Sequence, residues 1–81
     1  MRKITIVEKR PYDFKGKDGE QVTGNTYGGF LEDGEIINFS SKMNYDVVFA
    51  TSYDSEQAIE VDIIISIFDG KVKYRDNASR G

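Results

Sequence analysis

The segment Ala58–Phe68, with the sequence Ala-Ile-Glu-Val-Asp-Ile-Ile-Ile-Ser-Ile-Phe, decides the fold class of this chain. Every second residue from Ile59 to Ile67 is an isoleucine or a valine. Because successive side chains of a β-strand point to opposite faces, this period of two puts all five β-branched side chains on one face. We therefore expect a strand whose apolar face packs in the core with isoleucines of other strands. The expected core residues are Ile4, Ile6, Ile37, Ile59, Val61, Ile63, Ile65 and Ile67.

Shorter segments on both sides of this strand show the same alternation and are separated by turn signals. Asp-Gly pairs at 33–34 and 69–70 are typical of tight hairpins, because the turn needs residues that tolerate a positive φ. Residues 10–19 contain Pro11 and a further Asp-Gly pair, which predict a loop. The expected strands are 3–9, 20–31, 35–41, 47–50, 58–68 and 71–76, with a connector at 42–46 and a polar loop at 51–57.

Five or six short strands and the lack of a convincing helical pattern predict an all-β chain. An open sheet of this size would leave long edges that invite aggregation, and closure into a barrel removes them. We therefore expect a small five-stranded, or six-stranded, OB-like antiparallel barrel. An SH3-like barrel is the structural alternative. The domain is expected to span residues 1–76, with a frayed tail at 77–81.

Composition narrows the function classes. The chain has 81 residues, enough for one domain with a thin core, and it contains no cysteine and no histidine. The usual general base, thiol nucleophile and soft metal ligands are therefore missing, and we expect no enzyme activity, no cofactor and no metal site. No apolar run reaches the ~18–20 residues of a membrane span. The first ten residues do not resemble a signal peptide, so a cytoplasmic location is expected.

Charge is segregated along the chain. Residues 1–17 carry six bases and two acids, a net charge of +4. Residues 18–69 carry one base and eleven acids, a net charge of −10, and residues 70–81 carry four bases and one acid, a net charge of +3. If the two basic ends meet in space, they form one positive surface on an acidic body.

The stretch Lys9–Lys17, Lys-Arg-Pro-Tyr-Asp-Phe-Lys-Gly-Lys, interleaves four bases with two aromatic residues. Binding of a single-stranded nucleic acid needs this combination, because cations neutralise phosphates and aromatic faces stack bases at ~1–3 kcal/mol each. The alternative is that the two rings fold back over the thin core and the bases form a solvated turn. The candidate binding residues of this stretch are Lys9, Arg10, Tyr12, Phe14, Lys15 and Lys17.

The last expected strand carries three cations at a period of two, which suits contact with a phosphate backbone. The alternative is an edge strand that its charges protect from unwanted pairing. Tyr27 lies in mid-strand between Thr26 and Gly28, so its ring can belong to a binding groove or to the core. These segments add Lys71, Lys73, Tyr74, Arg75 and Tyr27 to the candidate residues.

The order of these features resembles a known class of proteins. After the basic, aromatic-bearing stretch come Gly24–Leu31, with the sequence Gly-Asn-Thr-Tyr-Gly-Gly-Phe-Leu, and a tight hairpin. Over Ser52–Arg75, a tyrosine-containing loop leads into the long alternating strand and a final hairpin. This layout resembles the small OB-type single-stranded DNA-binding proteins of filamentous phages and mobile elements. The resemblance implies a homodimer that coats single strands cooperatively, as in DNA replication.

Two functions remain open from the sequence. The first is sequence-independent binding of single-stranded DNA, with phosphates on the candidate lysines and arginines and bases on the candidate aromatic rings. The second is a small acidic β-barrel adaptor or inhibitor that binds another protein, because a segment with a net charge of −10 suits a basic partner. The exposure of the aromatic rings distinguishes the two.

Overall fold

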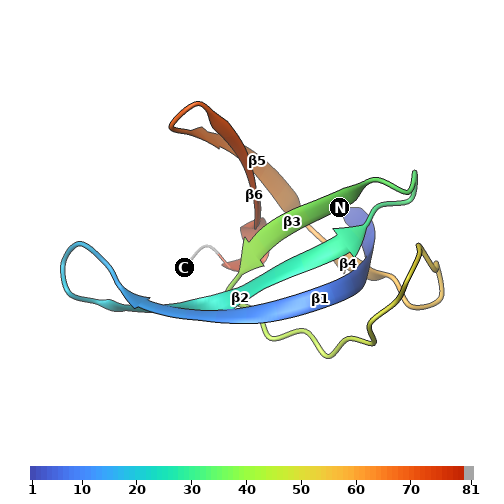
Figure 1. The fold of residues 1–81 in the computed structure, drawn as a ribbon, viewed down its shortest axis with the longest axis horizontal. Coiled ribbons are helices and arrows are strands. Elements are labelled where there is room, and N and C mark those ends of the chain that lie inside the picture. The colour runs from blue at the N-terminus through green and yellow to red at the C-terminus, as the bar shows by residue number, and fades with distance from the viewer. Residues whose placement is uncertain (80–81) are drawn as a thin grey trace.

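A computed structural model describes residues 1–79, which form a small β-structure with two protruding hairpins (Figure 1). The predicted all-β class is confirmed, and the described residues contain six strands and a short 3-10 helix. The elements are β1 (Arg2–Lys15), β2 (Gln21–Phe30), β3 (Ile36–Ser41), β4 (Ile59–Val61), β5 (Ile63–Phe68), β6 (Lys71–Asp76) and η1 (Asn77–Ser79). None of the described helical residues forms a segment long and apolar enough to cross a membrane.

The six strands of residues 1–79 form one sheet in the order β4-β1-β2-β3-β6-β5. Asp62 alone separates β4 from β5, so the first part of the 59–68 segment pairs with β1 and the second part with β6. This shared segment joins the two ends of the sheet and nearly closes a barrel. Counting β4 and β5 as one bent strand gives the five strands of the predicted OB-like barrel. The expectation of a purely antiparallel sheet is wrong, because β3 and β6 pair in parallel.

The core lies between the β1–β2–β3 side of the barrel and β4. Tyr27 and Phe39 are its largest buried side chains, and their rings stack with centroids 5.3 Å apart. The predicted burial of Ile4, Ile6 and Ile37 is confirmed. The full set of buried apolar residues is Ile4, Ile6, Tyr27, Leu31, Ile37, Phe39 and Val61.

The expected burial of the whole alternating row is wrong at its C-terminal end. Val61 is buried and Ile59 and Ile63 are half-buried against the core, but Ile65 is 65% and Ile67 is 76% exposed. The β5–β6 hairpin continues beyond the barrel, as Figure 1 shows, and leaves this part of the row without a covering layer in residues 1–79. The period of two identified the face of the strand correctly and carried no information about what covers it.

The expected loop at residues 10–19 is a continuation of β1. Residues up to Lys15 pair with β2, and the turn is limited to 16–20, where the Gly16 N–H donates to the Glu20 carbonyl at 2.8 Å. Pro11 fits this strand because β4 pairs with β1 only over residues 2–4, so beyond them β1 has a strand neighbour on one side. The result is a long β1–β2 hairpin that projects from the barrel (Figure 1).

The Asp-Gly turns form as predicted. Asp69 and Gly70 have φ values of 54° and 74°, which is the pattern of a type I′ turn. Gly34 has a φ of 87°, and its N–H donates to the Leu31 carbonyl at 2.9 Å. These turns fix the registers of β2–β3 and β5–β6.

The strand expected at 47–50 is absent from the described structure, and this segment belongs to an irregular connection between β3 and β4. The connection is attached to β1 instead of forming its own ladder. The Ala50 N–H donates to the Ile6 carbonyl at 2.9 Å, and the Thr5 hydroxyl accepts from the Asp54 N–H at 3.0 Å.

The tail expected to fray begins with an ordered turn. The Asn77 N–H donates to the Asp62 carbonyl at 2.8 Å, and residues 77–79 form η1. Residues 80–81 of the expected tail lie outside the described part of the chain.

A buried carboxylate connects the end of β6 with β3 and the connection that follows β3. Asp76 is 0% exposed and accepts hydrogen bonds from the Ser41 hydroxyl at 2.8 Å, the Tyr45 hydroxyl and the Ala78 N–H at 2.9 Å. Burial, together with the hydrogen bond to Asp76 and the negative charge of that carboxylate, raises the pKa of Tyr45 well above its usual value. Tyr45 therefore remains a hydrogen-bond donor to Asp76 at high pH.

Tyr45→Phe is expected to lower the free energy of unfolding at pH 7 by ~1–3 kcal/mol, because the buried carboxylate loses a donor. In the unfolded chain the phenol loses its proton near pH 10, whereas in the folded chain it keeps the proton. The stabilisation is therefore complete below pH 10 and is lost as the pH rises further. Urea unfolding at pH 7 and pH 11 should show a smaller difference between wild type and variant at pH 11. An equal difference at both pH values would contradict this.

Gly29→Ala is expected to destabilise the fold by ~1–3 kcal/mol through overpacking. A Cβ at Gly29 would clash with Ile4 Cγ2 and lie 2.9 Å from the Thr5 carbonyl oxygen, and neither atom can move without shifting β1. Gly28→Ala is the matched control, because the nearest atoms there belong to the flexible Glu8 and Asn38 side chains. Denaturant unfolding should separate the two variants, and equal stability of both would refute the proposed close approach.

Candidate nucleic-acid interface

The register of the sheet places the first three candidate residues on its outer face. Arg10, Tyr12 and Phe14 alternate with residues that point to the other side of β1, and their partners on β2 are Thr26, Gly24 and Val22. Thr26 pairs in turn with Ser40 on β3. The outer face of β1, β2 and β3 therefore carries aromatic residues on the hairpin and small polar residues toward the barrel.

Tyr12 and Phe14 form an aromatic pair on the β1–β2 hairpin. Their ring centroids are 5.9 Å apart and the rings are tilted by 37°. Phe14 is 55% exposed, and Tyr12 is half-buried because its ring lies across Gly24. A Cβ at Gly24 would lie 2.6 Å from Tyr12 Cζ, so glycine is required for this placement of the ring. One aromatic face is thus supported from beneath while the neighbouring ring remains open to solvent.

Two hollows share the lining residues Thr26 and Ser40 and therefore adjoin. The first lies between the aromatic pair and these two residues on the outer face, and the second extends from them to β6, where residues of both faces of that strand line it. We call the two adjoining hollows the β2–β3 groove. Its floor is uncharged. Its lining residues are Tyr12, Phe14, Val22, Thr26, Asn38, Phe39, Ser40, Val72, Lys73 and Tyr74.

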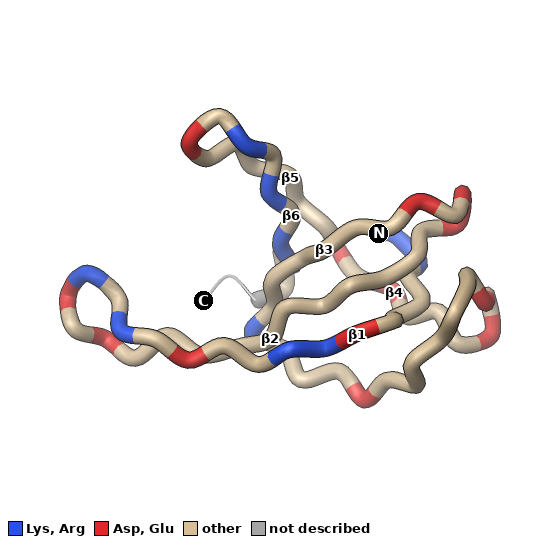
Figure 2. Tube along the Cα trace, viewed as in Figure 1, with Lys and Arg blue, Asp and Glu red and all other residues tan. Residues whose placement is uncertain are grey.

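Two hairpins flank the β2–β3 groove. Figure 1 shows that the β1–β2 and β5–β6 hairpins both project beyond the barrel on the side away from the 31–35 turn. In Figure 2 the two lysines and the arginine of β6 are the blue segments along one strand of the β5–β6 hairpin. The pairing of Arg75 with Ser40 puts Lys71, Lys73 and Arg75 on the outer face of the sheet, and all three are exposed.

The remaining cations of the first stretch do not all face the groove. Lys15 alternates with Phe14 along β1, so it points to the opposite side of the hairpin, and Lys17 lies in the turn. Both side chains are exposed near the hairpin tip. Arg10 lies on the outer face opposite Thr26, and its guanidinium lies 3.7 Å from a Glu8 carboxylate oxygen. Exposed pairs of this kind are worth little and are readily exchanged for a phosphate.

Two predicted site residues have structural roles instead. Tyr27 is 0% exposed, and its hydroxyl donates to the Met43 carbonyl at 2.8 Å and accepts from the Tyr45 N–H at 3.0 Å, so it cannot stack a base. Lys9 pairs with Tyr27 across the sheet and points to the same side. Its ammonium group donates to the Tyr45 carbonyl at 3.1 Å and to Asn44, and lies 5.7 Å from the centre of the Tyr27 ring.

The residues that form the floor of the groove are not among those predicted from the sequence. Thr26, Asn38 and Ser40 are small or polar residues, and nothing in their local sequence distinguishes them from ordinary solvent-facing strand positions. Their position along the strand could have placed them on the outer face, because each is next to a buried aromatic residue or isoleucine of the same strand. The contact between β3 and β6 that makes these residues the middle of a groove is not encoded locally.

The hairpins are only weakly cationic. The β1–β2 hairpin also contains Asp13, Asp18 and Glu20, and the Asp13 carboxylate accepts a hydrogen bond from the Gln21 amide. Figure 2 shows acidic residues gathered in the turns at the opposite end of the barrel. The molecule therefore has a mildly positive face between the hairpins and a more acidic body.

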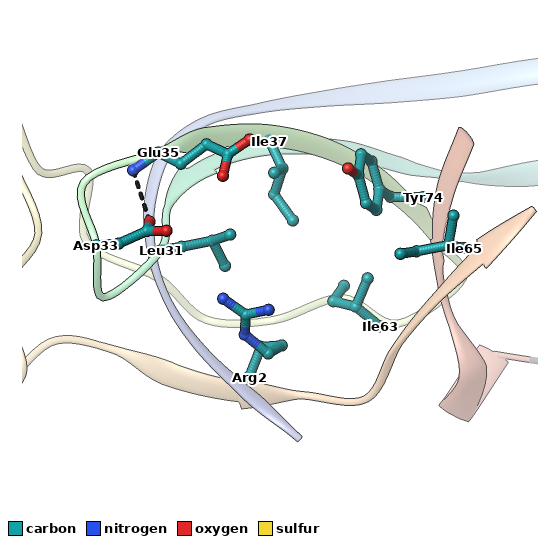
Figure 3. Close-up of a pocket in the computed structure, with 8 residues that line it drawn as sticks. All are labelled: Arg2, Leu31, Asp33, Glu35, Ile37, Ile63, Ile65 and Tyr74. Carbon is teal, nitrogen blue, oxygen red and sulfur yellow. Dashed lines mark hydrogen bonds between the residues drawn. The ribbon is translucent and has the colours of Figure 1, made fainter. Parts of the chain in front are cut away.

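A second depression lies at the incompletely closed mouth of the barrel (Figure 3). Leu31, Ile37 and Ile63 point into it, and Arg2 enters from the β1 side. The Asp33 carboxylate at its rim accepts the Glu35 N–H at 2.9 Å, which holds the turn rather than a ligand. Within residues 1–79 no cluster of three or more acidic side chains could hold a metal ion.

Comparison of the chain with models of protein families, with curated proteins and with solved structures finds no match.

Proposed function

We propose that this protein is a binding module for single-stranded DNA, which it holds in the β2–β3 groove without regard to base sequence. The observation that supports this most directly is that two adjoining hollows extend from an exposed aromatic pair to a basic strand. Bases would stack on Phe14 and Tyr12, and phosphates would lie against Lys71, Lys73, Arg75 and Arg10. Such a protein would cover single strands during the replication of a phage or mobile element.

The chemistry of the groove favours a single strand over a duplex. An aromatic face can stack only a base that has left the duplex, and each such stack is worth ~1–3 kcal/mol. The uncharged floor formed by Thr26, Asn38 and Ser40 lets the strand approach without repelling its phosphates. Stacking is independent of base identity because every base has a flat face, and phosphate contacts carry no sequence information.

The charge balance sets an expectation for affinity. Each neutralised phosphate of a single strand contributes about −0.7 to the slope of log affinity against log salt. With the four cations Arg10, Lys71, Lys73 and Arg75 engaged, the slope is about −3. The acids on the β1–β2 hairpin reduce the local potential, so stacking should contribute a larger share of binding than in strongly basic proteins.

The test is a fluorescence-polarisation titration of labelled oligo-dT at several salt concentrations. Phe14→Ala should weaken binding by the ~1–3 kcal/mol of a lost stack, about 5- to 150-fold, and leave the salt slope unchanged. Phe14 is preferred to Tyr12 because its ring does not cover a glycine. Phe49→Ala is the matched control, since Phe49 is 59% exposed in the irregular connection outside the groove.

The cations give an independent test. Replacing Lys71 and Lys73 together with alanine should flatten the salt slope by about 1.4, equally for oligonucleotides of different sequence. Replacing the exposed Lys3 and Lys42 together is the control for lost charge outside the groove. The proposal fails if wild type does not bind oligo-dT at ~50 mM salt, or if the control variants weaken binding as much as the groove variants. Labelled oligo-U in the same assay compares RNA with DNA.

A second candidate function rests on the acidic end of the molecule. The turns at that end concentrate negative charge away from the hairpins (Figure 2), and such a surface suits a basic protein partner. In this case the protein would bind a labelled oligo-arginine peptide, and reversing the charges of Glu32 and Asp33 would abolish that binding. Oligo-dT binding would not respond to this change except through a general increase in positive charge.

A further inference from the structure

The β5 strand has a free edge that differs from the free edge of β1. β5 pairs with β6 on one side, and no strand in residues 1–79 pairs with its other side. Unpaired N–H and C=O groups along such an edge are a template for another strand. Within residues 1–79, β1 also lacks a neighbouring strand on one side from Val7 to Lys15, but Pro11 and several charged residues interrupt that edge. β5, Ile-Ile-Ile-Ser-Ile-Phe, carries no charge and no proline.

The same hairpin exposes an apolar face. Ile65 and Ile67 are 65% and 76% exposed, and Val72, which pairs with Ile67 on β6, is 58% exposed. The cross-strand pairing puts these three side chains on one face of the hairpin, continuous with the half-buried Tyr74. Soluble monomers rarely expose a large contiguous apolar patch without a binding role, and here the patch adjoins a strand edge that is open to pairing.

We propose that the protein forms a homodimer in which the β5 strands of two copies pair antiparallel about a two-fold axis at Ser66. In this register Ile65 lies opposite Ile67 of the second copy, Ile64 opposite Phe68, and Ser66 opposite itself. Every cross-strand pair is uncharged, so the edge is complementary to itself, which an isologous interface requires. A different partner that offered a charged strand to this edge would not match its uncharged side chains.

The pairing closes at two copies and agrees with the rest of the surface. It uses the free edge of each β5, producing a four-stranded β6-β5-β5-β6 sheet with no further β5 edge for a third copy. Ile65 and Ile67 then have isoleucine neighbours ~4.5–5.5 Å away on the same face. Lys71 and Lys73 alternate with Val72 and emerge from the opposite face of the sheet, so the dimer leaves the cations of the β2–β3 groove exposed.

The test is sedimentation of the protein without nucleic acid, so that its outcome is independent of the DNA proposal. Wild type should sediment at twice the 9.2 kDa chain mass at micromolar concentration. Replacing Ile65 and Ile67 together with glutamate should give the monomer, because like charges then face each other across the two-fold axis. Both positions are largely exposed, so the variant should keep the fold, which circular dichroism would verify. Glutamate at Ile36 and Val48, 56% and 67% exposed elsewhere, should leave the dimer intact.

A charge-swap experiment makes the register specific. Mixing the double glutamate chain with a chain carrying lysine at Ile65 and Ile67 should restore a dimer made of one copy of each. Amide hydrogen exchange should also show protection of residues 63–68 that rises with protein concentration. The proposal is overturned if wild type stays monomeric at ~100 µM, if the double glutamate variant remains dimeric, or if the dimer leaves the β5 amides unprotected.

Discussion

The change of partner strand at Asp62 is the constraint on which the rest of the structure depends. Before this residue the chain pairs with β1, and after it the chain pairs with β6. Asn77 holds the bend from two sides, because its N–H donates to the Asp62 carbonyl at 2.8 Å and its amide to the Asp62 carboxylate at 2.9 Å. These two hydrogen bonds hold the bend in place, so that one segment can close the barrel and then continue beyond it as β5 of the β5–β6 hairpin.

This division explains why so small a chain has both a definite core and a large exposed apolar surface. The core needs only the part of the sheet around Tyr27 and Phe39. The hydrogen bond from the Ser41 hydroxyl to the buried Asp76 carboxylate connects the end of β6 to β3. The outer halves of the β1–β2 and β5–β6 hairpins are not required to fill the barrel. Their side chains are therefore free to supply the aromatic pair and the cations beside the β2–β3 groove and, on β5, the proposed dimer interface.

The electrostatics of the molecule favour a binding mode in which cations and rings act together. Acids lie on the same hairpin as the aromatic pair, and the body of the barrel is acidic. A surface of this kind does not attract a polyanion strongly at long range, because at physiological salt the field falls off within ~8 Å. In the proposed complex, short-range stacking on Phe14 and contact with the β6 cations would therefore supply the affinity, and flexible, unstacked strands would be preferred.

The sequence by itself determined the secondary structure class, the Asp-Gly turns and the shared face of the alternating row from Ile59 to Ile67, because φ preferences and side-chain alternation are local properties. Residue type also identified Phe14, Tyr12 and the β6 cations as candidate binding residues. Only the tertiary structure decided that Tyr27 is buried, that the row ending at Ile67 emerges into solvent, and that Thr26 and Ser40 form the floor of a groove. These outcomes depend on which distant segments of the chain pack against each face. The alternation of side chains within a single strand contains no information about that packing.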